Sequence, residues 1–269
     1  MALEINKIYC GDNLELIKQL DNNCVDLTVT SPPYDNLRTY NGYNWDFEGL
    51  AKELFRVTKE GGVVVWVVGD ATINGSETGT SFRQALYFME CGFNLHDTMI
   101  YYRWSGPLTH NRYEQEFEYM FVFSKGKPRT FNPIMIKCEY FQKEADRTSQ
   151  KIKKHFEINR KFRSENNRTN TKQYRQKGNV WECLNTSHTH EKNGHPAPFP
   201  EKLAEDHIIS WSNKGDLILD PFMGSGTTAK MALKNERDFI GFELSQEYCD
   251  IAEKRIAQWK EQERIDQWF

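Results

Sequence analysis

Residues 217–230 read LILDPFMGSGTTAK and contain a strand, a loop and the beginning of a helix in direct succession. The apolar run before Asp220 predicts a buried strand, and TTAK begins a helical pattern. Gly224, Gly226 and Ala229 follow a G-x-G-x-x-A spacing, in which the glycines let the backbone approach a ligand closely. The stretch therefore predicts a ligand-binding loop at the carboxyl end of a parallel strand.

The residues of this loop favour one ligand class over two others. A phosphate-binding loop would need a lysine directly after Gly226, and the chain has Thr227 there. A dinucleotide suits the glycines, but Asp220 and Phe222 place an acid and an aromatic ring where a pyrophosphate would lie, which favours a cationic ligand. Glu243 ends the next strand, where a carboxylate can accept hydrogen bonds from both ribose hydroxyls. S-Adenosylmethionine carries a ribose, a sulfonium and an ammonium group, whereas a dinucleotide site and a purely structural glycine turn stay open as alternatives.

Alternating strand and helix patterns on both sides of the loop predict a doubly wound α/β fold. Strands are expected at 5–12, 24–30, 63–70, 95–104, 118–126, 216–220 and 238–244, and helices at 13–20, 47–62, 81–93, 198–213, 227–235 and from Gln246 onward. We expect Gly61 and Gly62 to end the helix of 47–62. The strands 95–104 and 118–126 are close in sequence and predict an antiparallel element at a sheet edge.

A second motif, SPPY at 31–34, directly follows the strand pattern DLTVT. Each proline fixes φ and lacks an N–H, and a residue before proline is held extended, so the motif is a stiff turn whose carbonyls point outward. An exocyclic amino group needs two acceptors for its hydrogens before its nitrogen attacks a methyl group. The Ser31 hydroxyl and the Pro32 carbonyl suit that role, and Tyr34 offers a flat face for stacking an extruded base. The alternative is an ordinary strand-terminating turn.

The charges of the chain are unevenly distributed. The net charge of the whole chain is −3, yet residues 125–177 contain sixteen Lys/Arg against five Asp/Glu. Periodicity fails over 125–180, where aromatic residues are interleaved with Lys, Arg, Asn and Gln. Such a segment suits a polyanion such as nucleic acid, and the alternative is a solvated basic loop.

Composition excludes several classes of protein. With 38% hydrophobic and 13% aromatic residues, the 269-residue chain is not expected to be disordered, and it has no apolar run long enough to cross a membrane. No signal peptide is expected at the first residues, and the six scattered cysteines are expected to be reduced thiols in a cytoplasmic protein. Cys183, His188, His190 and His195 lie close together, but their spacing matches no common zinc site, so no metal is expected.

Taken together, the motifs resemble those of the β-class amino-group DNA methyltransferases. In that family the catalytic motif precedes the donor-binding motif and the recognition region lies between them, and here TSPPY comes first and DPFMGSGTT last. The segments YCGDNLELIKQLDNNCVDLTVTSPPY, EYMFVFSKGKP and HPAPFPEKLAEDHI also resemble family elements, so the resemblance covers nearly the whole chain. It implies a Rossmann-like sheet with circularly permuted motif order, S-adenosylmethionine as cofactor and double-stranded DNA as partner.

The resemblance also implies roles for individual residues. The catalytic motif would be Ser31, Pro32, Pro33 and Tyr34. The donor would be bound by Asp12, Thr30, Phe199, Pro200, Asp220, Pro221, Phe222, Gly224, Ser225, Gly226, Thr227 and Glu243. DNA contacts are expected from Arg38, Lys153, Lys154, Arg160, Arg163 and Arg168, and Tyr40 is a further candidate beside the catalytic motif; ordinary loop packing is the alternative for Arg38 and Tyr40.

The expected organisation is a catalytic half at 1–124, a target recognition region at 125–180 and a donor-binding half at 181–269. In the family, SPPY goes mostly with cytosine N4 and DPPY with adenine N6, so Ser31 favours N4-methylation of cytosine, with adenine N6 as the alternative. An RNA or protein amide substrate is a less favoured reading, and so is a DNA-binding relative without activity. The sequence leaves open the recognised site, a homodimer and a companion restriction endonuclease.

Overall fold

The computed structural model describes residues 3–33, 45–102, 113–137, 173–182 and 200–266. They fall into two compact units, one formed by Met1–Asn132 with Asn179–Phe269 and the other by Pro133–Gly178. Tyr34, Arg38, Tyr40, Lys153, Lys154, Arg160, Arg163, Arg168, Phe199 and the Cys183–His195 group lie outside the described residues.

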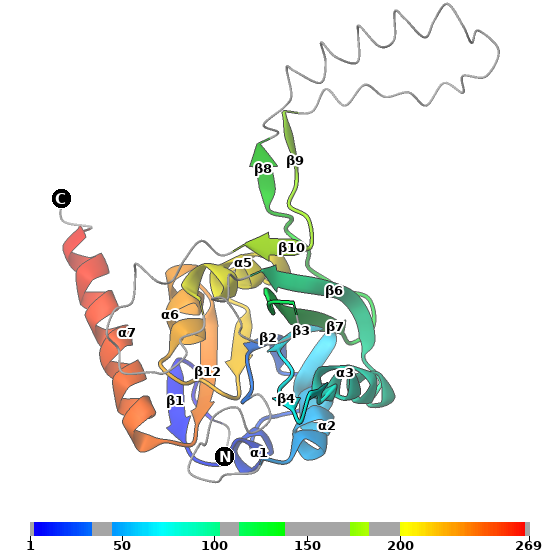
Figure 1. The fold of residues 1–269 in the computed structure, drawn as a ribbon. Helices are drawn as coiled ribbons and strands as arrows, with labels where there is room; N and C mark the ends of the chain where they lie inside the picture. Colours follow the sequence, from blue (N-terminus) through cyan, green and yellow to red (C-terminus); the bar gives the residue numbers. More distant parts are fainter. Residues whose placement is uncertain (1–2, 34–44, 103–112, 138–172, 183–199, 267–269) are drawn as a thin grey trace, which may run out of the picture. The chain divides into compact units, whose positions relative to one another are not determined.

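The first unit is built on an eight-stranded sheet in the order β1-β12-β11-β2-β3-β7-β6-β10 (Figure 1). In that order the strands are Lys7–Cys10, Asp238–Glu243, Leu217–Asp220, Val25–Thr30, Thr58–Val68, Phe117–Ser124, Asn94–Tyr102 and Val180–Glu182. All neighbouring pairs are parallel except the two that involve β7, which runs antiparallel to β3 and β6. The predicted α/β fold with a mostly parallel sheet is confirmed.

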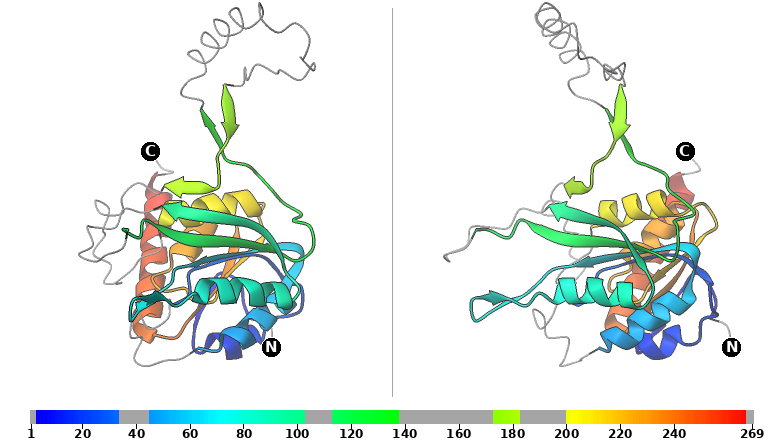
Figure 2. Two further views of the ribbon diagram at one scale, coloured as in Figure 1. Left: turned by 45° about the vertical axis from the view of Figure 1, so that its right-hand side comes forward. Right: turned by 90° about the vertical axis from the view of Figure 1, so that its right-hand side faces the viewer.

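Helices cover both faces of this sheet (Figure 2). They are α1 (Asn13–Ile17), α2 (Phe47–Val57) and α3 (Thr80–Glu90) on one face, and α5 (Glu201–Trp211), α6 (Thr227–Lys234) and α7 (Gln246–Asp266) on the other. Strand β3 serves both layers because its side chains alternate between the faces. Trp66 packs in the same core cluster as Leu54 and Phe88, which come from α2 and α3. A nearly continuous apolar run such as 63–68 is what a strand buried on both faces requires.

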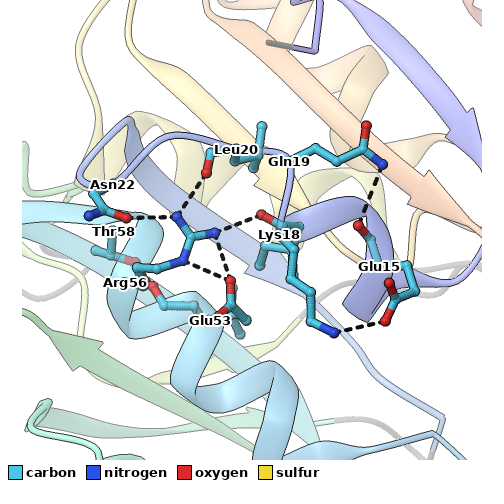
Figure 3. Close-up of polar contacts among 10 residues, drawn as sticks. Glu15, Lys18, Gln19, Leu20, Asn22, Glu53, Arg56 and Thr58 are labelled. Carbon is cyan, nitrogen blue, oxygen red and sulfur yellow. Dashed lines mark hydrogen bonds and ion pairs between the residues drawn. The ribbon is translucent and has the colours of Figure 1, made fainter. Parts of the chain in front are cut away.

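One arginine joins the first two helices (Figure 3). Arg56, near the end of α2, donates hydrogen bonds to the carbonyl oxygens of Ile17 at 2.9 Å and Leu20 at 2.8 Å. Its Nε also binds Glu53 at 2.8 Å. The last carbonyls of a helix have no partner within the helix, so Arg56 satisfies the end of α1 and fixes it against α2.

The order of strands places a topological switch point between β11 and β2. The connection from β2 to β3 passes through α2, whereas that from β11 to β12 passes through α6 on the opposite face. In open α/β sheets, ligands bind beyond the carboxyl ends of the strands at such a point. The loop after Asp220 and the motif after Thr30 both begin there.

Two expectations, one about the end of a helix and one about the edge of the sheet, are wrong. Gly61 and Gly62 do not end a helix, because α2 ends at Val57 and β3 already begins at Thr58, which is extended at φ −66° and ψ 130°. The glycines lie instead in a bulge of β3, where the φ of Gly61 is +79° and its N–H donates to the Lys125 carbonyl at 2.7 Å. The antiparallel strands are also not at the edge, because β10 pairs outside β6. This strand has only three residues, too few to be seen as a pattern.

The remaining elements are two small hairpin-like sheets. In the first unit, β4 (Thr72–Ile73) pairs with β5 (Ser76–Glu77), just before α3. In the second unit, β8 (Met135–Lys137) pairs with β9 (Tyr174–Gln176), within the range expected to recognise the target. Within the described ranges, no helix has both the length and the apolar character needed to span a bilayer.

Candidate active site

The carboxyl ends of neighbouring parallel strands bring the predicted residues of the two motifs to one edge of the sheet. The register aligns Cys10 of β1 with Glu243 of β12, and Asp220 of β11 with Gly241 of β12. Strand β2 lies on the other side of β11 and ends at Thr30. Residues separated by about 190 positions in the chain therefore lie side by side at the switch point.

Asp220 links the two motifs directly. Its side chain is 4% exposed, and its Oδ1 accepts hydrogen bonds from the Thr30 hydroxyl at 2.6 Å and from the Phe222 N–H at 3.0 Å. Burial raises the pKa of Asp220 to about 6, although hydrogen bonds from Thr30, Thr228 and the Phe222 N–H lower it. The main causes of this pKa are burial, these hydrogen bonds and the charge of Glu243, which raises the pKa further, so the carboxylate suits a ligand that brings its own positive charge.

Two glycines, one in the loop and one on the neighbouring strand β12, allow close approaches. Gly226 has a φ of +82°, and a Cβ there would lie 2.9 Å from the Cβ of Ala252 on α7. Gly241 on β12 leaves room for Met223, whose Cε would be 2.2 Å from an added Cβ. The loop is thus held tightly between β12 and α7, as the G-x-G-x-x-A spacing requires.

Glu243 fixes the same loop from the next strand. Its Oε2 accepts the Gly224 N–H at 2.8 Å, and its Oε1 accepts the Ser245 N–H at 2.9 Å. Each carboxylate oxygen has two lone pairs, so these bonds leave further acceptor capacity for hydroxyl groups. The residue expected to hold a ribose is therefore also a structural part of the loop.

The first helix contributes one expected and one unexpected residue. Asp12 is the N-cap of α1 and accepts the Glu15 N–H at 3.0 Å. Asn13, which the sequence analysis missed, is buried, and its Nδ2 donates to the Pro221 carbonyl at 3.3 Å. The sequence places two polar residues, Asp12 and Asn13, after β1. The contact between Asn13 and Pro221, however, depends on the pairing of β1 with β12, which the sequence does not show.

Two tryptophans that were not predicted, Trp45 and Trp66, border the expected residue Phe222 of the loop. The ring of Phe222 lies 4.9 Å from that of Trp45 in an edge-to-face arrangement and 6.2 Å from that of Trp66. Trp66 lies in the core of β3, where its indole N–H donates to Gln84 at 2.9 Å. Phe222 is therefore set by packing, and Trp45 adds a second aromatic surface beside the loop.

The first three residues of SPPY continue directly from the buried end of β2. Thr30 and Pro32 are buried, and Ser31 and Pro33 are half-buried. Pro200 is the N-cap of α5 and has extended backbone geometry. The other residues expected to bind the methyl donor, Pro221, Ser225 and Thr227, lie in the loop or at the start of α6. Within the described ranges, no group of three or more His, Cys, Asp and Glu side chains could hold a metal ion.

Arg255 of α7 is the main candidate functional residue that was not predicted from the sequence. Its Nη1 donates to the Ser225 carbonyl at 3.1 Å and to the Thr227 hydroxyl at 3.0 Å. Its Nη2 forms an ion pair with Glu201, whose carboxylate also binds Lys230 at 2.8 Å. No local signal could have found this residue, because one Arg in a polar helix looks like any other.

The chain is similar to several known proteins. A family model described as "DNA methylase" (N6_N4_Mtase) matches residues 25–254. The chain is 56% identical over 253 residues to the orphan methyltransferase M.BamHII of Bacillus amyloliquefaciens, covering 87% of this chain and 89% of that protein. It is 30% identical over 259 residues to the type II methyltransferase M.BglII of Bacillus subtilis, covering 92% of this chain and 68% of the relative.

Solved structures have the same fold. A putative DNA modification methylase of Thermus thermophilus, complexed with S-adenosyl-L-methionine, matches with a TM-score of 0.63 and 25% identity, covering 94% of this chain and 95% of the other. The cytosine-N4-specific PvuII DNA methyltransferase matches with a TM-score of 0.68 and 20% identity, covering 96% and 92%. At that identity the second match bears on the fold alone.

Proposed function

Because the chain belongs to the N6/N4 DNA methylase family, we propose that it transfers a methyl group from S-adenosylmethionine to the cytosine N4 amino group of a specific DNA site. The match over residues 25–254 shows the family, whose members use S-adenosylmethionine as the methyl donor. The choice of cytosine is our own inference from Ser31. The observation that carries the proposal is the hydrogen bond between Thr30 and Asp220, which joins the SPPY strand to the glycine loop.

The donor site is proposed at the carboxyl ends of β1, β11 and β12. S-Adenosylmethionine, when bound, supplies an electrophilic methyl group on a sulfonium. Asp220 offers a buried negative charge to a cationic ligand, and Glu243 offers acceptors to ribose hydroxyls. Asp12, Thr30, Phe199, Pro200, Pro221, Phe222, Gly224, Ser225, Gly226 and Thr227 complete the proposed set.

The catalytic group is proposed to be the SPPY motif. The Ser31 hydroxyl and the Pro32 carbonyl would accept the two hydrogens of the target amino group and stabilise the positive charge that develops on its nitrogen. Tyr34 would stack on the extruded base. Positioning would supply most of the acceleration, since the amino proton becomes acidic only after transfer and no strong base is needed beforehand.

The base preference is tested by identifying the product. Purified protein is incubated with unmethylated DNA and S-adenosylmethionine, and the DNA is digested to nucleosides for mass spectrometry. We expect N4-methylcytosine. N6-Methyladenine would contradict the inference from Ser31 but leave the reaction class intact, because a hydroxyl would then serve adenine as well.

The catalytic assignment has a matched pair of variants. Ser31→Ala removes one of the two proposed acceptors and is expected to lower kcat about 10²–10³-fold with little change in the Kd for S-adenosylmethionine. Thr98→Ala, on β6 away from the switch point, serves as the control. Methyl transfer by Ser31→Ala at the wild-type rate would overturn the assignment.

Target recognition is proposed for residues 125–180, within which Pro133–Gly178 forms a separate compact unit. Lys153, Lys154, Arg160, Arg163 and Arg168 would contact phosphates, and Arg38 would contact the backbone near the flipped base. Such contacts make affinity depend on salt, so replacing two of the lysines should reduce the slope of log K against log salt by about 2. An unchanged slope would argue for a solvated loop, and modification of RNA alone would favour the alternative substrate.

A homodimer through α3 is also proposed. Phe82, Leu86 and Met89 are 48%, 60% and 45% exposed on the same face of this helix. Arg83 and Glu90 are exposed near its opposite ends. An antiparallel two-fold pairing would place each Arg83 beside Glu90 of the partner subunit, so the face is complementary to itself.

The oligomeric state tests this proposal. Light scattering should show a dimer that Leu86→Glu dissociates and that Lys254→Glu on α7 leaves intact. A monomeric wild type would refute the proposed dimer.

The biological setting stays a prediction. Of the relatives compared, M.BamHII is described as an orphan methyltransferase and M.BglII as a type II methyltransferase. We propose a cytoplasmic enzyme that acts on the host's own DNA, with or without a companion restriction endonuclease. Sequencing the neighbouring genes and testing extracts for cleavage of unmethylated DNA would decide between the two settings.

A further inference from the structure

The C-terminal helix reaches the glycine loop through one side chain. Arg255 is 12% exposed, and its Nη1 lies 3.1 Å from the Ser225 carbonyl oxygen, 3.2 Å from Ser225 Oγ and 3.0 Å from Thr227 Oγ1. A backbone carbonyl and two hydroxyls on one nitrogen define the conformation of both residues that flank Gly226. Nη1 has two hydrogens for these three oxygens, so one hydrogen is shared, and the planar guanidinium fixes the direction of both.

A carboxylate holds the other end of this guanidinium. Glu201 Oε1 accepts from Arg255 Nη2 and also from Lys230 Nζ at 2.8 Å. Glu201 is the first residue of α5, directly after Pro200, which is one of the proposed donor-site residues. The ion pair therefore links the beginning of α5 to the glycine loop through α7.

The close approach at Gly226 belongs to the same arrangement. Ala252, which a Cβ on Gly226 would contact at 2.9 Å, precedes Arg255 by three residues on α7. Residues three apart lie on the same helix face. The missing Cβ brings α7 near enough for Arg255 to reach both sides of the turn.

We propose that Arg255, oriented by Glu201, is a positioning residue for the methyl donor: it sets the Ser225–Thr227 turn in the shape that binds S-adenosylmethionine. This inference rests on the donor site proposed above. Arg255 does not touch the reacting atoms and acts only through the loop. Lys230 already offsets the charge of Glu201, so neutralising that carboxylate does not require Arg255.

A role in positioning differs from a role in stability in what each variant changes. Arg255→Met keeps the length of the side chain and removes every loop contact. Lys230→Met removes a cation from the same carboxylate oxygen but leaves the loop contacts in place, so it is the matched control. Arg255→Lys keeps the charge and loses the planar fork.

The test combines calorimetric titration with S-adenosylmethionine, thermal unfolding and steady-state kinetics on the full-length chain. We expect Arg255→Met to raise the Kd and the KM for the donor about tenfold or more, with kcat at saturating donor within about twofold of wild type. Arg255→Lys should recover part of the affinity. Lys230→Met should lower Tm without changing the donor Kd.

Three results would overturn the proposal: an unchanged donor Kd in a folded Arg255→Met variant, an equal rise in Kd for Lys230→Met, or a loss confined to kcat. If Arg255→Met does not fold, amide hydrogen exchange of residues 224–228 in Arg255→Lys decides, since faster exchange is expected there and unchanged exchange refutes the role. Failure of the donor-site assignment is distinguishable, because Glu243→Ala would then bind S-adenosylmethionine like wild type.

Discussion

Asp220 carries the largest electrostatic cost at the site. Its folded-state pKa of about 6 lies above the ordinary value of 3.8 because the carboxylate is buried. Between about pH 4 and 6 the folded protein therefore binds more protons than the unfolded chain, so stability falls as pH rises through this window. Below it the cost is absent, and above it the full cost, on the order of 2–3 kcal/mol, is present.

Asp220→Asn should remove this cost. Of the three hydrogen bonds to Asp220, those from Thr30 and from the Phe222 N–H end on Oδ1, which asparagine retains. We expect the donor-free variant to exceed wild type in Tm at pH 8 and to match it near pH 4, while it binds S-adenosylmethionine more weakly. Asp250→Asn, at an exposed position of α7, is the control. A Tm difference that does not change with pH would contradict the proposed cause.

Among secondary-structure elements, α1 and α2 share a hydrophobic core and are also joined by the hydrogen bonds of one side chain, Arg56. Arg56→Ala would leave the Leu20 carbonyl without its donor and the Ile17 carbonyl with only the Leu20 N–H, at 3.0 Å, and should lower the free energy of unfolding by about 1–3 kcal/mol. Lys18→Ala removes an exposed ion pair with Glu15 and should lower the free energy of unfolding far less than Arg56→Ala does. Urea denaturation of both variants checks this, and equal losses would refute the role of Arg56 as a cap.

The elements also show what local sequence contains. The two motifs can be predicted because spaced glycines and paired prolines are each compatible with few backbone structures. Strands β2, β3 and β11 can be predicted because buried strands are apolar along most of their length. The end of α2 was misread at Gly61 because a positive φ is equally suited to a bulge in a strand. Asn13, Trp45 and Arg255 were missed because their roles arise from contacts between distant parts of the chain.

In the chain as a whole, the second unit is attached through two adjacent strand ends. The Lys177 N–H donates to the Ile134 carbonyl at 2.8 Å, so residues 134 and 177 can be joined by a short glycine linker. We expect the shortened chain to unfold cooperatively and to bind S-adenosylmethionine with unchanged Kd while losing DNA methylation. Calorimetry, titration and product analysis against the full-length chain check this. Loss of cooperative unfolding would show that Pro133–Gly178 supports the sheet.

The nearness of those two ends has a consequence for inheritance. A stretch that leaves and re-enters a scaffold at one place can be exchanged by recombination between related genes without disturbing the parts that carry out the chemistry. If Pro133–Gly178 recognises the target, as proposed, a lineage that meets new invading DNA would acquire a different target in a single event, whereas point changes would have to pass through forms that mark the wrong sites. The same junction offers a place to graft the corresponding segments of relatives in the laboratory.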